Sequence, residues 1–63
     1  MNNDIDAIDL AIRSRVYRKT HGLNQRQLAA LVKTSPGVIG ELEREKVRSR
    51  RVAQEIIALT TEA

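Results

Sequence analysis

Helix-boundary residues recur at short intervals along this 63-residue chain and divide it into short helical segments. Gly22 favours the left-handed backbone conformation that ends a helix. Asn24 and Gln27 have the spacing of a capping box, which starts a helix. Ser35 followed by Pro36 places an N-cap next to a residue suited to the first helical position. A chain divided in this way has room for several short helices packed on one another.

Apolar residues between these boundaries recur at spacings of three and four, which is typical of amphipathic helices. We expect helices over about 4–21, 25–32, 36–44 and 50–60, the last capped by Ser49. Aliphatic residues are plentiful and Tyr17 is the one aromatic residue, so the core should be aliphatic, which suits helices better than sheets. The prediction is one all-α domain over 1–63 with four helices, a fifth being left open.

The residue types needed for catalysis or metal binding are scarce. The chain has no cysteine and a single histidine, His21, which we expect near the last carbonyls of the first helix. Because no thiolate, second imidazole or convergent carboxylate pair is available, we expect no enzyme, no cofactor and no metal site. No apolar run approaches the roughly 20 residues of a membrane span. The N-terminus is polar and acidic, so the expected location is the cytoplasm, in association with the nucleoid.

Charge is unevenly distributed along the chain. Eleven Lys and Arg residues face eight Asp and Glu residues, a net charge of +3. Acidic residues gather near the N-terminus, whereas five cationic residues lie between positions 44 and 51: Arg44, Lys46, Arg48, Arg50 and Arg51. Such a cluster indicates a surface for a polyanion, the alternative being a merely solvated charged surface.

The second and third helical segments are joined by a three-residue turn, and Ala29 provides a small residue where they would cross. This pattern is typical of a helix-turn-helix motif, over about 25–44. The chain resembles the Cro and phage-repressor type of helix-turn-helix regulators, the XRE family, over roughly its central half. The resemblance lies in Tyr17-Arg18, Gly22-Leu23-Asn24-Gln25, Gln27-Leu28-Ala29, Ile39 and Glu43-Arg44-Glu45-Lys46. It implies a small lambda-repressor-like domain.

The chain departs from the family pattern at three positions. Lys33 stands where the family most often has a glycine in a left-handed turn, a replacement that costs about 1 kcal/mol. Thr34 replaces a usual aliphatic residue. Glu45 replaces another common glycine after the third helix.

By resemblance the third helix is the one that reads DNA, with its N-terminal part in the major groove. The residues then expected at the bases are Pro36, Gly37, Val38, Gly40 and Glu41. The glycines would permit close approach of the backbone, Pro36 and Val38 would contact thymine methyl groups, and Glu41 would accept a hydrogen bond from cytosine. Alternatively, specificity comes from DNA shape, the glycines serve packing inside the protein, and Glu41 pairs with a nearby Lys or Arg.

Phosphate contacts are expected on both sides of this helix. Gln25 and Arg26 start the second helix, and the family commonly uses that glutamine for a phosphate. The further candidates are Ser35, Arg44, Lys46, Arg48, Arg50 and Arg51. Because Arg50 and Arg51 oppose the dipole of the helix that they start, we interpret them as serving an anionic partner rather than helix stability.

The first helix carries an apolar stripe of Ile5, Ile8, Ile12 and Val16. In the family register Leu10, Ser14 and Tyr17 pack inward, so the stripe is either a spare apolar face or, if the register differs, the core. Family members bind DNA as two-fold dimers. We therefore predict a homodimer, with the stripe and the C-terminal residues Ile57 and Leu59 as competing interfaces.

These features together predict a sequence-specific DNA-binding transcription regulator. The prediction is a repressor of phage, plasmid or mobile-element type that binds an inverted-repeat operator in double-stranded DNA as a homodimer. The alternative is a protein-interaction module, such as an antitoxin or antirepressor, that holds a protein partner on the same scaffold.

Overall fold

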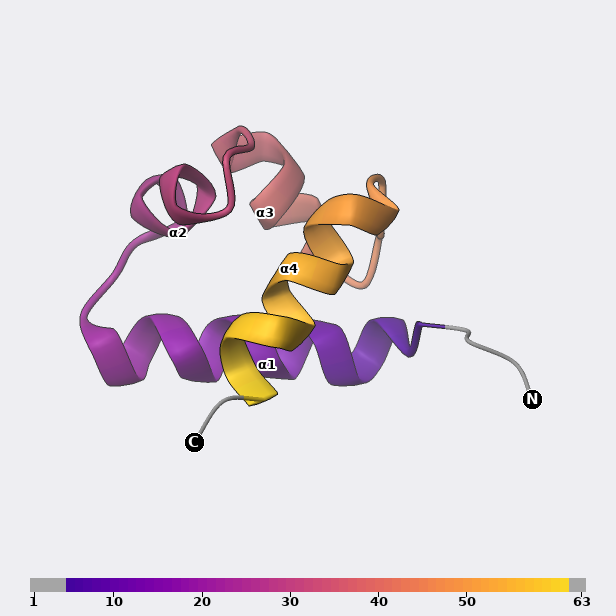
Figure 1. Cartoon of the computed structure of the whole chain (residues 1–63), viewed down its shortest axis with the longest axis horizontal. Helices are drawn as coiled ribbons and strands as arrows, with labels where there is room; N and C mark the ends of the chain where they lie inside the picture. Colours follow the sequence, from indigo (N-terminus) through magenta and orange to yellow (C-terminus); the bar gives the residue numbers. More distant parts are fainter. Residues whose placement is uncertain (1–4, 62–63) are drawn as a thin grey trace.

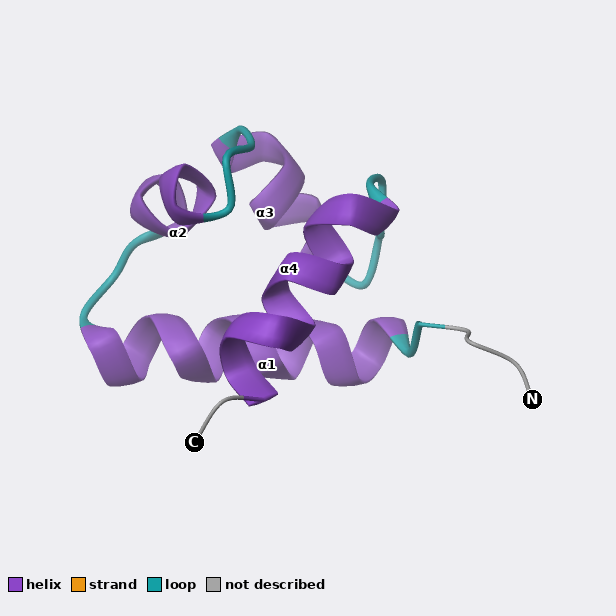
Figure 2. Ribbon diagram, viewed as in Figure 1, coloured by secondary structure: helices purple, strands orange, loops and turns teal. Residues whose placement is uncertain are grey.

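The computed structural model describes residues 5–61, which fold as four helices (Figures 1 and 2). These are α1 (Ala7–His21), α2 (Gln25–Leu31), α3 (Pro36–Leu42) and α4 (Arg50–Thr61). No strand occurs in this range, so the predicted all-α class is confirmed, and no fifth helix is found between residues 5 and 61. None of the four helices is long and apolar enough to cross a membrane.

The helices form two pairs around one core. In Figure 1, α1 runs along one edge, α4 crosses it, and α2 and α3 lie together on the opposite side. Ala29 is buried between the helices, as its small size predicts. The buried apolar cluster consists of Leu10, Leu28, Ala29, Val32, Ile39, Leu42, Val52, Ala53 and Ile56. As expected, this core is aliphatic.

The predicted caps are present. Gly22 ends α1 with φ +67°, Asn24 and Gln27 form the complete capping box of α2, and the Ser35 hydroxyl accepts from the Val38 N–H at 3.4 Å. Ser49 caps α4 by accepting from the Val52 N–H at 3.2 Å. These local bonds satisfy N–H groups that the first turn of a helix leaves without partners.

Two helix limits differ from the prediction by more than one residue. α1 begins at Ala7 rather than near residue 4, because the Asp6 carboxylate accepts from the N–H groups of Ile8 and Asp9 and makes Asp6 the N-cap. Asp4 itself lies outside the described residues. α3 ends at Leu42 rather than Arg44, because the chain turns through a left-handed residue soon afterwards.

That residue is Glu45, and Lys33 has the same kind of conformation after α2. Their φ angles are 68° and 56°, and among residues 5–61 no other non-glycine residue has a positive φ. After α3, the Lys46 N–H donates to the Glu41 carbonyl at 2.8 Å; after α2, the Thr34 N–H donates to that of Ala29 at 2.8 Å. Lys33 and Glu45, which stand where the family usually has glycine, thus both form left-handed turns that end a helix.

We expect Glu45→Gly to raise the free energy of unfolding by about 1 kcal/mol, because it relieves the left-handed strain of a residue that carries a Cβ. Glu45 is exposed, so little packing is lost. Glu45→Ala is the control, since it removes the same side chain and keeps the Cβ. Urea titration at neutral pH measures both variants. Equal stability of the two would contradict this account of the turn.

The inward face of α1 has the register that the resemblance implies. Leu10, Ala11 and Ser14 are buried, whereas Ile8, Ile12 and Val16 are 58%, 54% and 57% exposed. The alternative that the stripe forms the core is therefore wrong for these three residues. Ile5 differs from them, because it is half-buried and packs against the core. α1 thus has one face in the core and a second apolar face at the surface.

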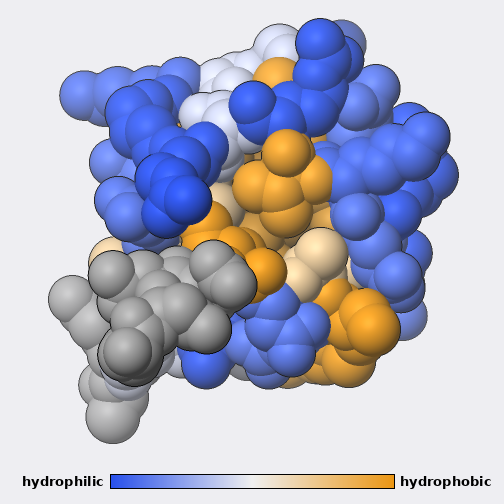
Figure 3. Space-filling model, turned by 90° about the vertical axis from the view of Figure 1, so that its right-hand side faces the viewer, coloured by the Kyte–Doolittle hydropathy of each residue, from blue (hydrophilic) through white to orange (hydrophobic). Residues whose placement is uncertain are grey.

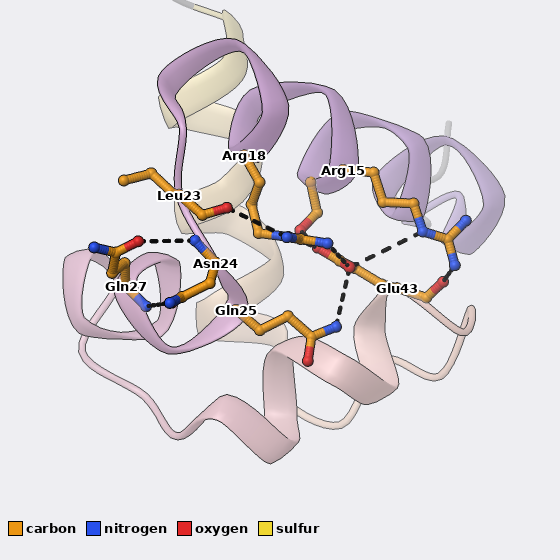
Figure 4. Close-up of polar contacts among 8 residues, drawn as sticks. Arg15, Arg18, Leu23, Asn24, Gln25, Gln27 and Glu43 are labelled. Atoms are coloured by element: carbon orange, nitrogen blue, oxygen red, sulfur yellow. Dashed lines mark hydrogen bonds and ion pairs between the residues drawn. The ribbon is translucent and has the colours of Figure 1, made fainter.

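The carboxylate of Glu43 joins α1, α2 and the end of α3 (Figure 4). It is 2% exposed and accepts from the Ser14 hydroxyl at 2.6 Å and from the Arg18 guanidinium at 2.7 and 2.8 Å. The Gln25 amide donates to it at 3.2 Å, and Arg15 donates to the Glu43 carbonyl at 2.6 Å. Three helices are thereby fixed through one residue.

Two opposing effects act on this carboxyl. Burial alone would raise the pKa of Glu43, but hydrogen bonds from Arg18, Ser14 and Gln25, together with the charge of Arg18, outweigh burial and hold the pKa below its ordinary value. The hydrogen bond to Glu43 in turn raises the pKa of Arg18, against the effect of burial. The pair therefore remains charged at neutral pH.

Because the folded-state pKa of Glu43 is lowered, its contribution to stability is present above the unfolded-state pKa of about 4.3 and is lost as pH falls through the folded-state value. We expect the free energy of unfolding to fall below about pH 4, and to fall less in Glu43→Gln. At pH 7 the free energy of unfolding of Glu43→Gln should be about 3 kcal/mol lower than that of the parent protein, because the substitution leaves the buried side of Arg18 without its counter-charge.

Asp9→Asn is the matched control for this pH experiment. It makes the same acid-to-amide change in the exposed Asp9–Arg13 pair, in which Nε of Arg13 lies 2.6 Å from Oδ2 of Asp9. An exposed pair of this kind contributes about 0.5 kcal/mol or less. Urea titrations at pH 7 and pH 3 measure the difference, and equal losses in the two variants would show that the Glu43 network is not a major source of stability.

Candidate nucleic-acid interface

The start of α3 presents a bare surface. Ser35, Pro36 and Gly37 are exposed, and a Cβ added to Gly37 would meet only the Ser35 hydroxyl, at 3.9 Å. Val38 is half-buried and packs against the core, which limits what it could offer to a thymine methyl group. Within the helix, the residues free to meet a ligand in its first turn are thus Pro36 and Gly37.

Gly40 is buried, so the prediction that the two glycines share an exposed face is wrong for this residue. A Cβ at Gly40 would lie 3.4 Å from Oε1 of Gln25 and 3.8 Å from a terminal nitrogen of Arg44. Both polar side chains therefore lie over the backbone of α3 where a larger residue would project. The packing interpretation of this glycine is the one that the structure supports.

Gln25 has a fixed orientation in this arrangement. Its Nε2 donates to Glu43, and its Oε1 lies toward Gly40, so one carboxylate determines how the amide meets α3 (Figure 4). One N–H of the amide and its carbonyl oxygen keep further hydrogen-bonding capacity. The polar groups that α3 lacks are thus provided by Gln25 from α2 and by Arg44, just beyond the end of α3.

Glu41 is paired within the protein. Its carboxylate lies 3.4 Å from a guanidinium nitrogen of Arg48, and its side chain is 30% exposed. The pair supports the interpretation of Glu41 as a surface ion-pair residue over that of a reader of cytosine. It also places Arg48, from the segment between α3 and α4, beside α3.

Arg51 has a structural role that the sequence did not indicate. Its guanidinium donates to the carbonyls of Val32 and Lys33, at 3.2 and 2.8 Å, and lies 3.6 Å from the Glu55 carboxylate. The interpretation that Arg51 does not serve helix stability is therefore wrong. It opposes the dipole of its own helix, α4, but favours that of α2, whose last carbonyls it caps.

We expect Arg51→Ala to lower the free energy of unfolding by about 1 kcal/mol, because it removes two hydrogen bonds to the end of α2. Arg50→Ala is the matched control: the neighbouring residue begins the same helix and is exposed, and its side chain has no hydrogen bond or ion pair among the described residues. Thermal or urea unfolding measures both. If the two variants are equally stable, the hydrogen bonds from Arg51 to the end of α2 do not contribute to stability.

Four of the predicted cationic residues are exposed and have no ion pair within residues 5–61: Arg26, Arg44, Lys46 and Arg50. Arg26 is on α2, and the other three follow α3 along the chain. Arg44 lies over Gly40 of α3, Arg48 pairs with Glu41 of α3, and Arg51 donates to the turn after α2. Of the predicted phosphate-binding residues, Gln25, Arg44 and Arg48 thus lie beside α3, and Arg51 lies at the turn that precedes it.

The remaining predicted site residues lie elsewhere. Ile57 and Leu59 are half-buried against the core, like Ile5, so they offer less to a dimer interface than Ile8, Ile12 and Val16 do. His21 is exposed near the end of α1 and stacks on Tyr17, with ring centroids 4.1 Å apart.

Sequence reasoning missed the pairing of Arg18 and Glu43, although both residues carry the family resemblance. Their separation of 25 positions lies beyond any local pattern. It also missed the role of Gly40, whose neighbours Gln25 and Arg44 are defined only once α2 packs on α3. A polar residue directly after the buried Leu42 is the one signal that could have indicated a buried carboxylate.

No protein-family model matches this chain, and neither the curated proteins nor the solved structures contain a significant match to it. The resemblance to the XRE family therefore remains a prediction from the motif. Among residues 5–61, no group of three or more His, Cys, Asp or Glu side chains is arranged to hold a metal ion.

Proposed function

We propose that this protein is a DNA-binding transcription regulator that places α3 in the major groove. The observation that supports this proposal is the surface around Gly40. There the amide of Gln25 and the guanidinium of Arg44 lie over a short, bare helix, and Arg48 lies beside the same helix through its pair with Glu41. A helix with small side chains can approach the floor of the major groove closely, and donors beside it then reach the base edges.

Each exposed group then has a distinct role. Arg44 has the fork of donors that suits guanine O6 and N7 or a phosphate, and Gln25 has the amide that suits adenine N6 and N7 or a phosphate. Pro36 provides an apolar contact at the start of α3, and Gly37 permits close approach. Compared with the prediction from sequence, the reading groups shift from Gly40 and Glu41 to Gln25 and Arg44.

Arg26, Lys46 and Arg50 would neutralise phosphates on either side of the groove. They are exposed, and no carboxylate of the described residues holds them. Contacts of this type release counterions from DNA, so affinity falls steeply as salt rises. Occupying DNA that polymerase needs would then repress transcription, which suits a regulator of a phage, plasmid or other mobile element acting at the nucleoid.

The predicted homodimer on an inverted repeat requires both α3 helices on the same side of the dimer. Ser14 of α1 points to Glu43 at the end of α3. Ile12 and Val16 are each two residues from Ser14, so at about 100° per residue they lie on nearly the opposite side of α1. A dimer through the stripe would point the α3 helices apart. We therefore do not propose that a dimer formed through the stripe binds the two adjacent half-sites of one inverted repeat.

The second candidate is a protein-interaction module of the antitoxin or antirepressor kind. The exposed apolar residues Ile8, Ile12 and Val16 favour it, because an apolar stripe on a small domain usually marks an interface. The two functions differ in their salt dependence. A gel shift with mixed duplex DNA at about 50 and 200 mM salt should show strongly salt-sensitive binding for a regulator and none for a module of this kind.

A quantitative form of this test uses the double variant Lys46→Ala/Arg50→Ala. We expect the slope of log affinity against log salt concentration to become shallower by about 0.9 for each phosphate contact removed, so by about 2 in total. Fluorescence anisotropy of a labelled duplex measures the slope. Affinity should fall for all DNA sequences alike, since phosphate contacts carry no sequence information.

Arg13→Ala/Lys19→Ala is the matched control, because it removes the same charge from α1. If both double variants change the slope equally, net charge and not this surface determines DNA binding. Arg44→Ala adds a specificity test, in which sequences selected from a random duplex pool should lose their preference at one position. A pool that shows no preference in the parent protein would contradict sequence-specific recognition.

A further inference from the structure

The ion pair between Glu41 and Arg48 lies beside the part of α3 that the proposed function places in the major groove. Oε2 of Glu41 lies 3.4 Å from a terminal nitrogen of Arg48. Glu41 comes four residues after the exposed Gly37, so these two residues lie on one face of α3. The pair therefore links Arg48, which belongs to no helix, to the face of α3 on which Gly37 permits close approach.

The backbone on both sides of Arg48 is anchored. Val47 is half-buried and packs against the core. Ser49 caps α4, because its hydroxyl accepts from the Val52 N–H at 3.2 Å. Figure 3 views the molecule from the right-hand side of Figure 1, where this segment lies, and shows hydrophilic side chains on both sides of an apolar patch. With fixed neighbours and a guanidinium held by Glu41, Arg48 is restrained at both ends of its side chain.

Arg48 keeps most of its donors in spite of this pair. Its side chain is 63% exposed, and among the described residues its guanidinium has no partner other than Glu41. A guanidinium has several N–H donors in a fixed fork, so the others remain available to a ligand. Because ordering a long side chain costs conformational entropy, an arginine that is already held loses less of it on binding. In this respect Arg48 differs from the unpaired Arg26, Lys46 and Arg50.

The carboxylate of Glu41 determines which acceptors suit Arg48. A phosphate bound to Arg48 would bring its negative charge near that of Glu41, and like charges repel. The edge of guanine offers the acceptors O6 and N7 without a net charge. Glu41 therefore weakens the attraction of Arg48 for phosphate, but it leaves the bidentate hydrogen bonding that recognises guanine.

We propose that Arg48 reads a guanine in the major groove and that Glu41 is the residue that positions it. This inference rests on the proposed function, because it requires α3 in the groove. It moves Arg48 from the predicted phosphate-binding residues to the base-reading ones. Glu41 then contributes to specificity through Arg48 and without contact to a base.

Selection from a random duplex pool should locate this guanine as the position at which Arg48→Ala loses its preference. Fluorescence anisotropy then compares duplexes with and without that guanine. The specificity ratio should be about tenfold lower in Arg48→Ala and in Glu41→Ala, the factor expected for one bidentate contact. The double variant should lose no more than Arg48→Ala, because the two residues act as one unit. Additive losses would overturn the positioning role of Glu41.

Glu45→Ala is the matched control for charge. Glu45 is exposed, follows α3 and has no ion pair among the described residues, so the substitution removes a carboxylate that positions nothing. It should strengthen binding to all duplexes alike and leave the specificity ratio unchanged. If Glu41→Ala behaves in the same way, Glu41 acts only through its charge and the proposal is wrong. An exposed ion pair contributes little to stability, so we expect all these variants to fold.

Two further probes separate a base contact from a phosphate contact. Arg48→Lys keeps the charge but lacks the fork, so it should lose the guanine preference and keep its affinity for mixed DNA. Replacing the selected guanine by 7-deazaguanine removes the N7 acceptor, which should weaken binding of the parent protein and not that of Arg48→Ala. An Arg48→Lys variant with the full preference for guanine would instead assign Arg48 to a phosphate.

Failure of this inference is distinguishable from failure of the proposed function. A parent protein that binds no duplex would refute the proposed function and the inference with it. A parent protein that selects sequences whose preferences Arg48→Ala leaves unchanged would overturn the inference alone, and the reading groups would then be limited to Gln25 and Arg44.

Discussion

The buried carboxylate of Glu43 is the interaction on which the arrangement of α1, α2 and α3 depends. α2 and α3 have seven residues each, and isolated helices of this length are not stable in water. Their positions must therefore come from tertiary contacts. Apolar packing provides most of the free energy but tolerates small shifts, whereas hydrogen bonds from Ser14, Arg18 and Gln25 to one carboxylate require defined directions. Glu43 thus gives the aliphatic core its orientation.

The same carboxylate connects the fold to the candidate DNA surface. Glu43 holds Nε2 of Gln25, which turns Oε1 toward Gly40, and the missing side chain at Gly40 leaves space for Gln25 and Arg44. A glycine weakens a short helix, but Gly40 also leaves a surface on which other segments can place polar groups. This explains how a helix with almost no donors of its own could read DNA. The proposed reading groups therefore belong to the motif as a whole rather than to α3.

The parts of the structure that local rules govern could be predicted from the sequence. Caps at Asn24, Ser35 and Ser49 depend on neighbouring residues only. The left-handed turn at Lys33 is implied by the family resemblance instead, because neither Lys33 nor Glu45 is a residue type that favours a positive φ. The parts that depend on distant residues could not be predicted in this way. The dipole of its own helix gives no reason for Arg51, yet Arg51 caps α2, and only tertiary packing brings the carbonyls of Val32 and Lys33 within its reach. Helical spacing alone likewise puts Gly40 on an exposed face, because the residues that cover it, Gln25 and Arg44, lie outside α3.

The register of α1 also determines the position of any interface on its outer face. Ser14 is the residue that points to Glu43, and a hydroxyl at this place is useful only because it can donate to the carboxylate. With Ser14 inward, helical periodicity directs Ile12 and Val16 outward, and no other register would keep both Leu10 and Ser14 buried. The polar contact that orients the core therefore also exposes the apolar stripe. Consequently a partner on the stripe and a ligand on α3 must meet opposite sides of the domain.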